Sequence, residues 1–217
     1  MIVPMDATAI SSEQLAYWYF RLNGFMTTVN FVVHPEEGEG QRTDVDVLGV
    51  RFPHRAELLN DPMVDDVPFT HEKNRPYVVI AEVKRDGCKL NGPWTRPGDR
   101  NMQRVLTAIG VVHPEEQETA AEALYASGAF QSEKVLLSLC CIGGTENRVV
   151  RRTFKSVPQI LWPQITAFIF QRFHAYFCQK RSHPQLDETG RLLLKLFESA
   201  ESVEAFGTAV QSRLVSG

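Results

Sequence analysis

Two carboxylates and one ammonium group interrupt apolar stretches of this 217-residue chain. Asp46 stands immediately before the apolar run 47–50, and Glu82 and Lys84 fall at the end of another apolar run that begins at Tyr77. A charge that is buried without a partner costs several kcal/mol. These three side chains are therefore expected either to pair with one another or to bind a ligand.

A divalent metal ion would suit this group of side chains. Mg²⁺ prefers oxygen ligands and keeps some of its waters, so one carboxylate from each of two neighbouring strands can hold it. A nearby ammonium group can orient or activate a water molecule. The chemistry that suits these residues is hydrolysis of a phosphodiester, in which Asp46 and Glu82 bind Mg²⁺ or Mn²⁺ and Lys84 positions the attacking water.

The spacing of apolar residues predicts the elements that must position these side chains. A capping-box sequence begins at Ser11, and the helical spacing after it predicts a helix that ends at Gly24. β-Branched and aromatic residues predict strands over 27–33, 44–52, 77–84 and 134–142. Amphipathic spacing predicts helices over 99–110, 115–127, 157–181, 188–199 and 202–213. This order predicts an α/β fold, a mixed sheet flanked by helices.

The pattern resembles the PD-(D/E)xK nuclease superfamily, which shares the restriction-endonuclease-like fold. Asp46 matches the first Asp of the family motif, although Val45 replaces the family's proline, and Glu82-Val83-Lys84 matches its Glu-x-Lys. The resemblance covers about residues 11 to 142 and implies an α-β-β-β-α-β core, a divalent metal and a nucleic-acid substrate, with DNA favoured over RNA. Many members also carry a Glu on the first helix near the metal, and Glu13 is the residue that would match it.

Basic residues gather in two parts of the chain. Residues 84–104 hold six basic residues against two acidic ones, and residues 143–181 hold seven against one. The whole chain has a net charge of −3, so this segregation favours contact with a polyanion such as nucleic acid. The candidate contacts to phosphate are Arg96, Arg100, Arg104, Arg151 and Arg152.

The predicted domain organisation is a nuclease-like core over residues 1–145 and a helical extension over 146–217 that packs on it. The apolar helices of the extension could also pair two copies, so a homodimer or a partner protein remains open. None of the four cysteines shows C-x-x-C spacing, which favours reduced thiols in a cytoplasmic protein. Polar residues interrupt the apolar stretch 160–177, which excludes it as a membrane span.

Plainer interpretations of the same residues stay open. The three motif residues could form an ordinary cross-strand ion pair, and Glu13 could simply support the helix dipole. Trp94 could stack on a base or pack in the core. Two alternative functions follow: a non-catalytic nucleic-acid-binding or scaffold module of the same fold, and an unrelated α/β protein with an internal salt bridge.

Overall fold

A computed structural model describes residues 9–56, 58, 60, 64–72, 74–181 and 186–216. Its central sheet consists of β2 (Met26–Val33), β3 (Thr43–Arg51), β4 (Tyr77–Val83), β6 (Leu136–Gly143) and β5 (Ala129–Gln131), hydrogen-bonded in that order, and β7 (Gln159–Leu161) also pairs with β6. The first three of these strands are antiparallel, whereas β4 and β6 run parallel. The sheet is therefore mixed. The short strands β1 (Ile10–Ser11) and β8 (Leu214–Val215) form a separate parallel pair.

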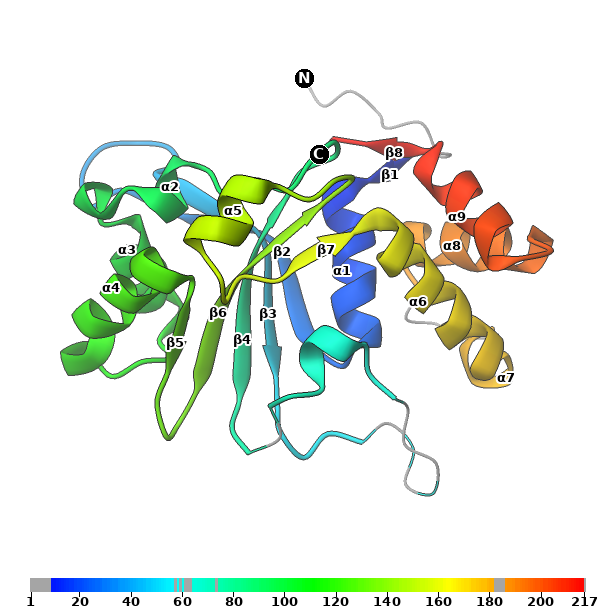
Figure 1. The fold of residues 1–217 in the computed structure, drawn as a ribbon, viewed down its shortest axis with the longest axis horizontal. Coiled ribbons are helices and arrows are strands. Elements are labelled where there is room, and N and C mark those ends of the chain that lie inside the picture. The colour runs from blue at the N-terminus through cyan, green and yellow to red at the C-terminus, as the bar shows by residue number, and fades with distance from the viewer. Residues whose placement is uncertain are drawn as a thin grey trace.

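Helices cover both faces of the sheet (Figure 1). One face packs against α1 (Ser12–Leu22), α6 (Trp162–Ala175), α8 (Glu188–Ser199) and α9 (Val203–Gln211), and α7 (Phe177–Lys180) follows α6. The other face packs against residues of α2 (Gly92–Thr95), α3 (Asn101–Ile109), α4 (Gln117–Ser127) and α5 (Arg148–Thr153). The predicted class, an α/β fold with a mixed sheet flanked by helices, is confirmed.

The start of α1 follows the local sequence closely. Ser11 is the N-cap, and its hydroxyl accepts a hydrogen bond from the backbone N–H of Gln14 at 3.1 Å. Leu15, Tyr19 and Phe20 are completely buried in the cluster between α1 and the sheet. The capping box and the helical spacing thus produce the element that the sequence predicts.

The predicted helix over 157–181 is wrong at its N-terminal end. Residues 159–161 form β7, which pairs in parallel with Cys141, Ile142 and Gly143 of β6, and α6 begins only at Trp162. Pro163 lies in the first turn of α6, where a missing N–H costs nothing, whereas in a helix that began at 157 it would lie in the interior and remove a hydrogen bond. The helix α5, at 148–153, was not predicted at all.

The C-terminal part of the chain completes the layer that covers the α1 face. Phe173, Leu193 and Phe206 from α6, α8 and α9 share one buried cluster with α1. Within the described residues, no helix combines the length and the apolar character that a membrane span would need.

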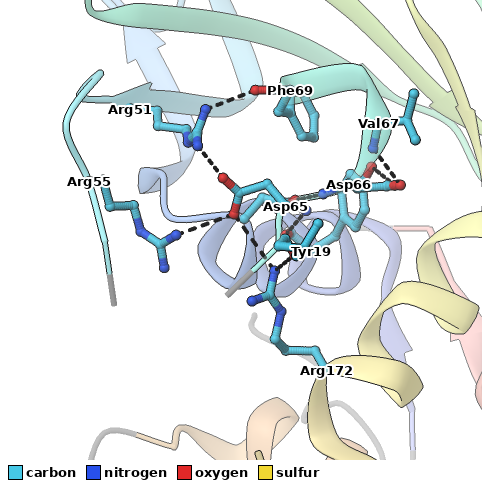
Figure 2. A network of polar contacts seen from close by, with 10 residues as sticks. Tyr19, Arg51, Arg55, Asp65, Asp66, Val67, Phe69 and Arg172 are labelled. Carbon is cyan, nitrogen blue, oxygen red and sulfur yellow. Dashed lines mark hydrogen bonds and ion pairs between the residues drawn. The ribbon is translucent and has the colours of Figure 1, made fainter. Parts of the chain in front are cut away.

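A network of ion pairs ties α6 to the end of β3 (Figure 2). The carboxylate of Asp65 forms ion pairs with Arg51 of β3, with Arg55 at 3.3 Å and with Arg172 of α6 at 3.7 Å. Arg172 also donates a hydrogen bond of 2.6 Å to the carbonyl of Val64. The side chains of Asp65 and Arg172 are only 9% and 2% exposed, so the charges depend on one another for compensation.

Asp66, the next residue, anchors the same segment to α1. Its carboxylate accepts hydrogen bonds from the Tyr19 hydroxyl at 2.5 Å and from the Gln164 side chain at 2.9 Å. Its backbone N–H donates to the side-chain oxygen of Asn23 at 2.7 Å. The segment around residue 65 therefore joins β3, α1 and α6.

Candidate functional site

Asp46, Glu82 and Lys84 come together where β3 and β4 lie side by side. Asp46 belongs to β3, Glu82 belongs to the neighbouring β4, and Lys84 directly follows β4. The ammonium nitrogen of Lys84 lies 3.2 Å from Asp46 Oδ2 and 2.6 Å from Glu82 Oε1. The three residues singled out in the sequence therefore form one polar group.

The ammonium group of Lys84 occupies a position surrounded by oxygen atoms. Besides the two carboxylates, it donates a hydrogen bond of 3.0 Å to the carbonyl oxygen of Val83. The Lys84 side chain as a whole is 33% exposed. Among the described residues, no donor contacts the second carboxylate oxygen of Asp46. Three oxygens, Asp46 Oδ2, Glu82 Oε1 and the Val83 carbonyl, surround one cation position, which the Lys84 ammonium occupies. We call this position the seat.

The regular pattern of β2 and β3 is interrupted at this point. Val45 and Val47 pack in clusters on opposite faces, although residues two apart in a regular strand share a face. Asn30, which lies between the paired residues Val29 and Phe31 of β2, has a left-handed backbone with φ of 52°. The backbone N–H of Val83 donates to Asp46 Oδ2 at 2.7 Å, so an aspartate side chain provides the acceptor where the strand ladder ends.

Glu82 is the most enclosed member of the group, with only 3% of its surface exposed. Its Oε1 accepts a hydrogen bond from the side-chain amide of Asn91, and its Oε2 accepts one of 2.5 Å from the indole N–H of Trp94. Burial raises the pKa of Glu82 above its ordinary value, and the charge of Asp46 adds to this effect. Hydrogen bonds from Lys84 and Trp94 act in the opposite direction.

The pKa of Lys84 lies above its ordinary value. Burial lowers it, but the hydrogen bond and charge of Glu82, together with Asp46, outweigh that cost. Lys84 is therefore fully charged at neutral pH. A lysine whose pKa is higher in the folded than in the unfolded protein stabilises the folded state at every pH below its unfolded pKa. This stabilisation is lost only as the pH rises through the raised pKa of the folded state.

Glu13 is not part of this group. It lies on α1, which packs on the face of the sheet opposite Trp94. Its Oε1 accepts a hydrogen bond of 3.1 Å from the Ser12 hydroxyl, and it makes no hydrogen bond or ion pair with the three motif residues. The other oxygen, Oε2, is buried and has no hydrogen-bond partner among the described residues.

The basic residues expected to hold phosphate differ in whether an acidic side chain already pairs with them. Arg100 pairs with Glu118 at 3.6 Å, and Arg104 pairs with Glu36 at 2.9 Å. Arg96 is exposed beside α2. Two of these three candidate arginines, Arg100 and Arg104, are therefore already paired with acidic side chains of the same chain.

The exposed arginines of α5 lie toward the end of the sheet that carries the site. The segment before α5 joins the segment after β4 through a backbone hydrogen bond of 2.9 Å from Cys88 to Thr145. Arg151 pairs with Glu146, and both side chains are largely exposed, while Arg152 is exposed on the same helix. Val150 is buried and anchors α5 to the body of the protein.

Three contributors to the site were missed in the sequence: Asn91, Trp94 and the carbonyl of Val83. Nothing in the residue types of the segment 91–94 indicates which strand it returns to. Trp94 is 1% exposed, which confirms packing in the core and excludes stacking on a base. A backbone carbonyl carries no sequence signal at all.

Asp46, Glu82 and the Val83 carbonyl offer oxygen atoms, the type of ligand that a hard divalent cation takes. Within the described residues, no three Asp, Glu, His or Cys side chains gather into a metal site. The third oxygen of this seat is instead the Val83 carbonyl, which is a suitable ligand for Mg²⁺ together with water. Searches against family models, curated proteins and solved structures found no match to this chain. A functional assignment therefore rests on the chemistry of the site.

Proposed function

We propose that this protein is a metal-dependent nuclease of the PD-(D/E)xK type, built on a restriction-endonuclease-like core. The observation that supports the proposal is the convergence of Asp46, Glu82 and the Val83 carbonyl on one cationic nitrogen. A helix, three antiparallel strands, further helices and a parallel strand also occur in the order that this family resemblance implies. Nucleic acid, with DNA favoured over RNA, is the substrate that we propose.

Each residue has a distinct task in this proposal. Asp46, Glu82 and the Val83 carbonyl would hold Mg²⁺ or Mn²⁺. Bound there, the ion would neutralise charge on the phosphate and favour hydrolysis of the phosphodiester. Lys84 would leave the seat, and its flexible side chain would let the ammonium group position the attacking water. The exposed arginines of α5 would contact the phosphate backbone.

The test is incubation of the protein with labelled single- and double-stranded DNA and RNA, in Mg²⁺, in Mn²⁺ and in EDTA. We expect cleavage that needs the metal ion and that Asp46→Asn, purified in the same way, lacks. Cleavage that survives in Asp46→Asn would come from a contaminant. No cleavage of any substrate in either metal ion would contradict the proposal.

One observation favours a second candidate, a non-catalytic module in which the same residues form an internal ion-pair network. Both oxygens of Glu82 already have donors, from Lys84, Asn91 and Trp94. Glu82 therefore has a donor for each oxygen without a metal ion. Calorimetry with Mn²⁺ distinguishes the two candidates. A site in which a metal ion replaces the Lys84 ammonium would give a heat of Mn²⁺ binding that is absent in Asp46→Asn. An internal ion-pair network would give no such heat.

The arginines of α5 provide a separate prediction. Replacement of Arg151 and Arg152 together by Ala is expected to weaken nucleic-acid binding and to reduce the slope of log affinity against log salt by about one to two. The reason is the loss of up to two phosphate contacts. Fluorescence anisotropy over a salt series measures the slope. Replacing Lys195 and Glu198 of α8 by Ala should leave the slope unchanged, and an unchanged slope in the arginine variant would exclude α5 from the interface.

A further inference from the structure

A pocket of about 610 Å³ lies between the end of β2, the turn that follows it, and the helices α3 and α4. Its apolar walls include Val32, Pro35 and Ala108. The volume falls within the range of about 300 to 1,000 Å³ that is typical of sites for small organic ligands. None of the described residues that line the pocket belongs to the seat, so a ligand in the pocket would contact a different set of side chains.

Arg104 is the more enclosed of two cations in this pocket. Its side chain is 22% exposed, and it donates hydrogen bonds of 2.6 Å to the carbonyl of Asp99 and of 2.9 Å to the carboxylate of Glu36. Glu36 lies on the turn after β2, and its side chain is 69% exposed. An ion pair with such an exposed partner contributes little stability. Another anion can therefore take the place of the Glu36 carboxylate on Arg104.

Arg100, the second cation, also has an exposed partner. It pairs with Glu118 at 3.6 Å, and the two side chains are 66% and 61% exposed. Arg100 and Arg104 both line the pocket, and the backbone N–H of Arg104 donates to the carbonyl of Arg100, one helical turn earlier. Guanidinium groups donate paired hydrogen bonds to phosphate oxygens. Two neighbouring arginines with replaceable carboxylate partners thus suit a phosphate group.

The neutral polar groups of the pocket suit a base. The Gln103 amide nitrogen donates one long hydrogen bond of 3.4 Å to Glu118, and its buried oxygen has no hydrogen-bond partner among the described residues. A glutamine amide pairs with the edge of adenine through one donor and one acceptor. A base between the apolar walls would therefore complete the hydrogen bonding of Gln103 once the amide turns toward it.

We propose that this pocket binds a nucleoside 5′-phosphate, with the phosphate on Arg104 and Arg100 and the base beside Gln103. The carboxylate of Glu36 competes with that phosphate for Arg104, so the turn after β2 limits occupation of the site. A free nucleotide and the 5′-phosphorylated end of a nucleic-acid strand present the same groups to these side chains. Binding of either one would need neither a metal ion nor the proposed nuclease activity.

The experiment measures the binding of AMP, adenosine and ribose 5-phosphate by calorimetry in EDTA. Adenosine lacks the phosphate and ribose 5-phosphate lacks the base. We expect AMP to bind at least about tenfold more tightly than either, as for the gain of a hydrogen bond to a charged group. A 5′-phosphorylated oligoadenylate separates the two sources. Tighter binding than AMP, if Arg104→Gln removes the difference, would identify a strand end, and weaker binding would identify a free nucleotide.

Substitutions on the two sides of one ion pair should have opposite effects. Arg104→Gln removes the cation that holds the phosphate, so the affinity for AMP is expected to fall by about tenfold or more. Glu36→Gln removes the competing carboxylate, so the affinity is expected to rise by about three- to fivefold, which corresponds to an exposed ion pair. Both variants break the same contact, and a merely structural ion pair would therefore give the two variants similar effects.

Glu39→Gln and Asp46→Asn are the controls. Glu39 is exposed on the same turn as Glu36, and its replacement removes the same charge without freeing Arg104. The affinity for AMP should then change by less than about twofold, because solvent screens exposed charges at a distance. Asp46→Asn should bind AMP as the unsubstituted protein does, whether or not that protein cleaves nucleic acid.

AMP that binds no more tightly than adenosine and ribose 5-phosphate, or that does not bind at all, would overturn the proposal. A fall in affinity in Glu36→Gln would also contradict it, since the carboxylate would then support the site instead of competing. An equal rise in Glu39→Gln would mean that only the net charge of the turn matters. Loss of AMP binding in Asp46→Asn would place the nucleotide at the seat instead of in this pocket.

Discussion

Replacement of Lys84 by Met is expected to abolish cleavage of nucleic acid while it strengthens the binding of Mn²⁺. The Lys84 ammonium lies within 3.2 Å of Asp46 Oδ2, Glu82 Oε1 and the Val83 carbonyl, so it competes for the oxygens that a metal ion needs. Methionine keeps most of the length of the side chain and removes the charge. We expect cleavage to fall about 1000-fold, as for loss of a group that stabilises charge in the transition state.

Metal affinity should change in the opposite direction. Removal of one positive charge a few ångströms from the seat is worth about 1–4 kcal/mol at the effective dielectric constants of a partly exposed site, so a rise of about tenfold or more is expected. Calorimetry at pH 8 measures it. Lys89→Met, which changes an exposed lysine five residues further along the chain, should alter neither quantity.

The outcome distinguishes the two candidate functions. An internal ion-pair network would lose stability in Lys84→Met, because Asp46 and Glu82 would then repel one another, and the unsubstituted protein would show no metal-dependent cleavage to lose. Mn²⁺ that restores the melting temperature of Lys84→Met would support a cation seat. Weaker Mn²⁺ binding in this variant would contradict the geometry that we propose.

Replacement of Asp65 by Ala is expected to destabilise the folded protein by about 3–5 kcal/mol, the usual cost of removing one partner from a buried ion pair. Figure 2 shows the reason: side chains from β3, from the segment after it and from α6 all converge on this carboxylate. The Arg51 and Arg172 side chains are 10% and 2% exposed, so water cannot replace the lost partner. Urea unfolding at pH 7 measures the free energy.

Asp65→Asn separates the charge from the hydrogen bonds. If the negative charge is what these arginines require, Asn should be nearly as damaging as Ala, although it keeps the shape of the side chain. Asp86→Ala, at an exposed aspartate after β4, should change the free energy of unfolding by less than about 0.5 kcal/mol. A loss at Asp65 no larger than that would mean that the network does not hold α6 in place.

Most of the secondary structure could be predicted from the sequence, because its signals are local. The capping box at Ser11 and the apolar runs that lead to Glu82 and into β6 each depend on residues a few positions apart. Failures came where tertiary contacts override the local pattern. Residues 159–161 join the sheet only because β6 has an edge left free to pair with them.

The candidate site divides in the same way. The sequence by itself determined that Asp46, Glu82 and Lys84 interrupt apolar strands. This could be predicted because side chains alternate between faces in any strand, and a buried charge without a partner is costly in any protein. Only the tertiary structure decided that Glu13 lies on the other face, that Asn91 and Trp94 return to Glu82, and that three arginines share Asp65. Such contacts join residues through the packing of whole elements, and no spacing along the chain specifies which partners will meet.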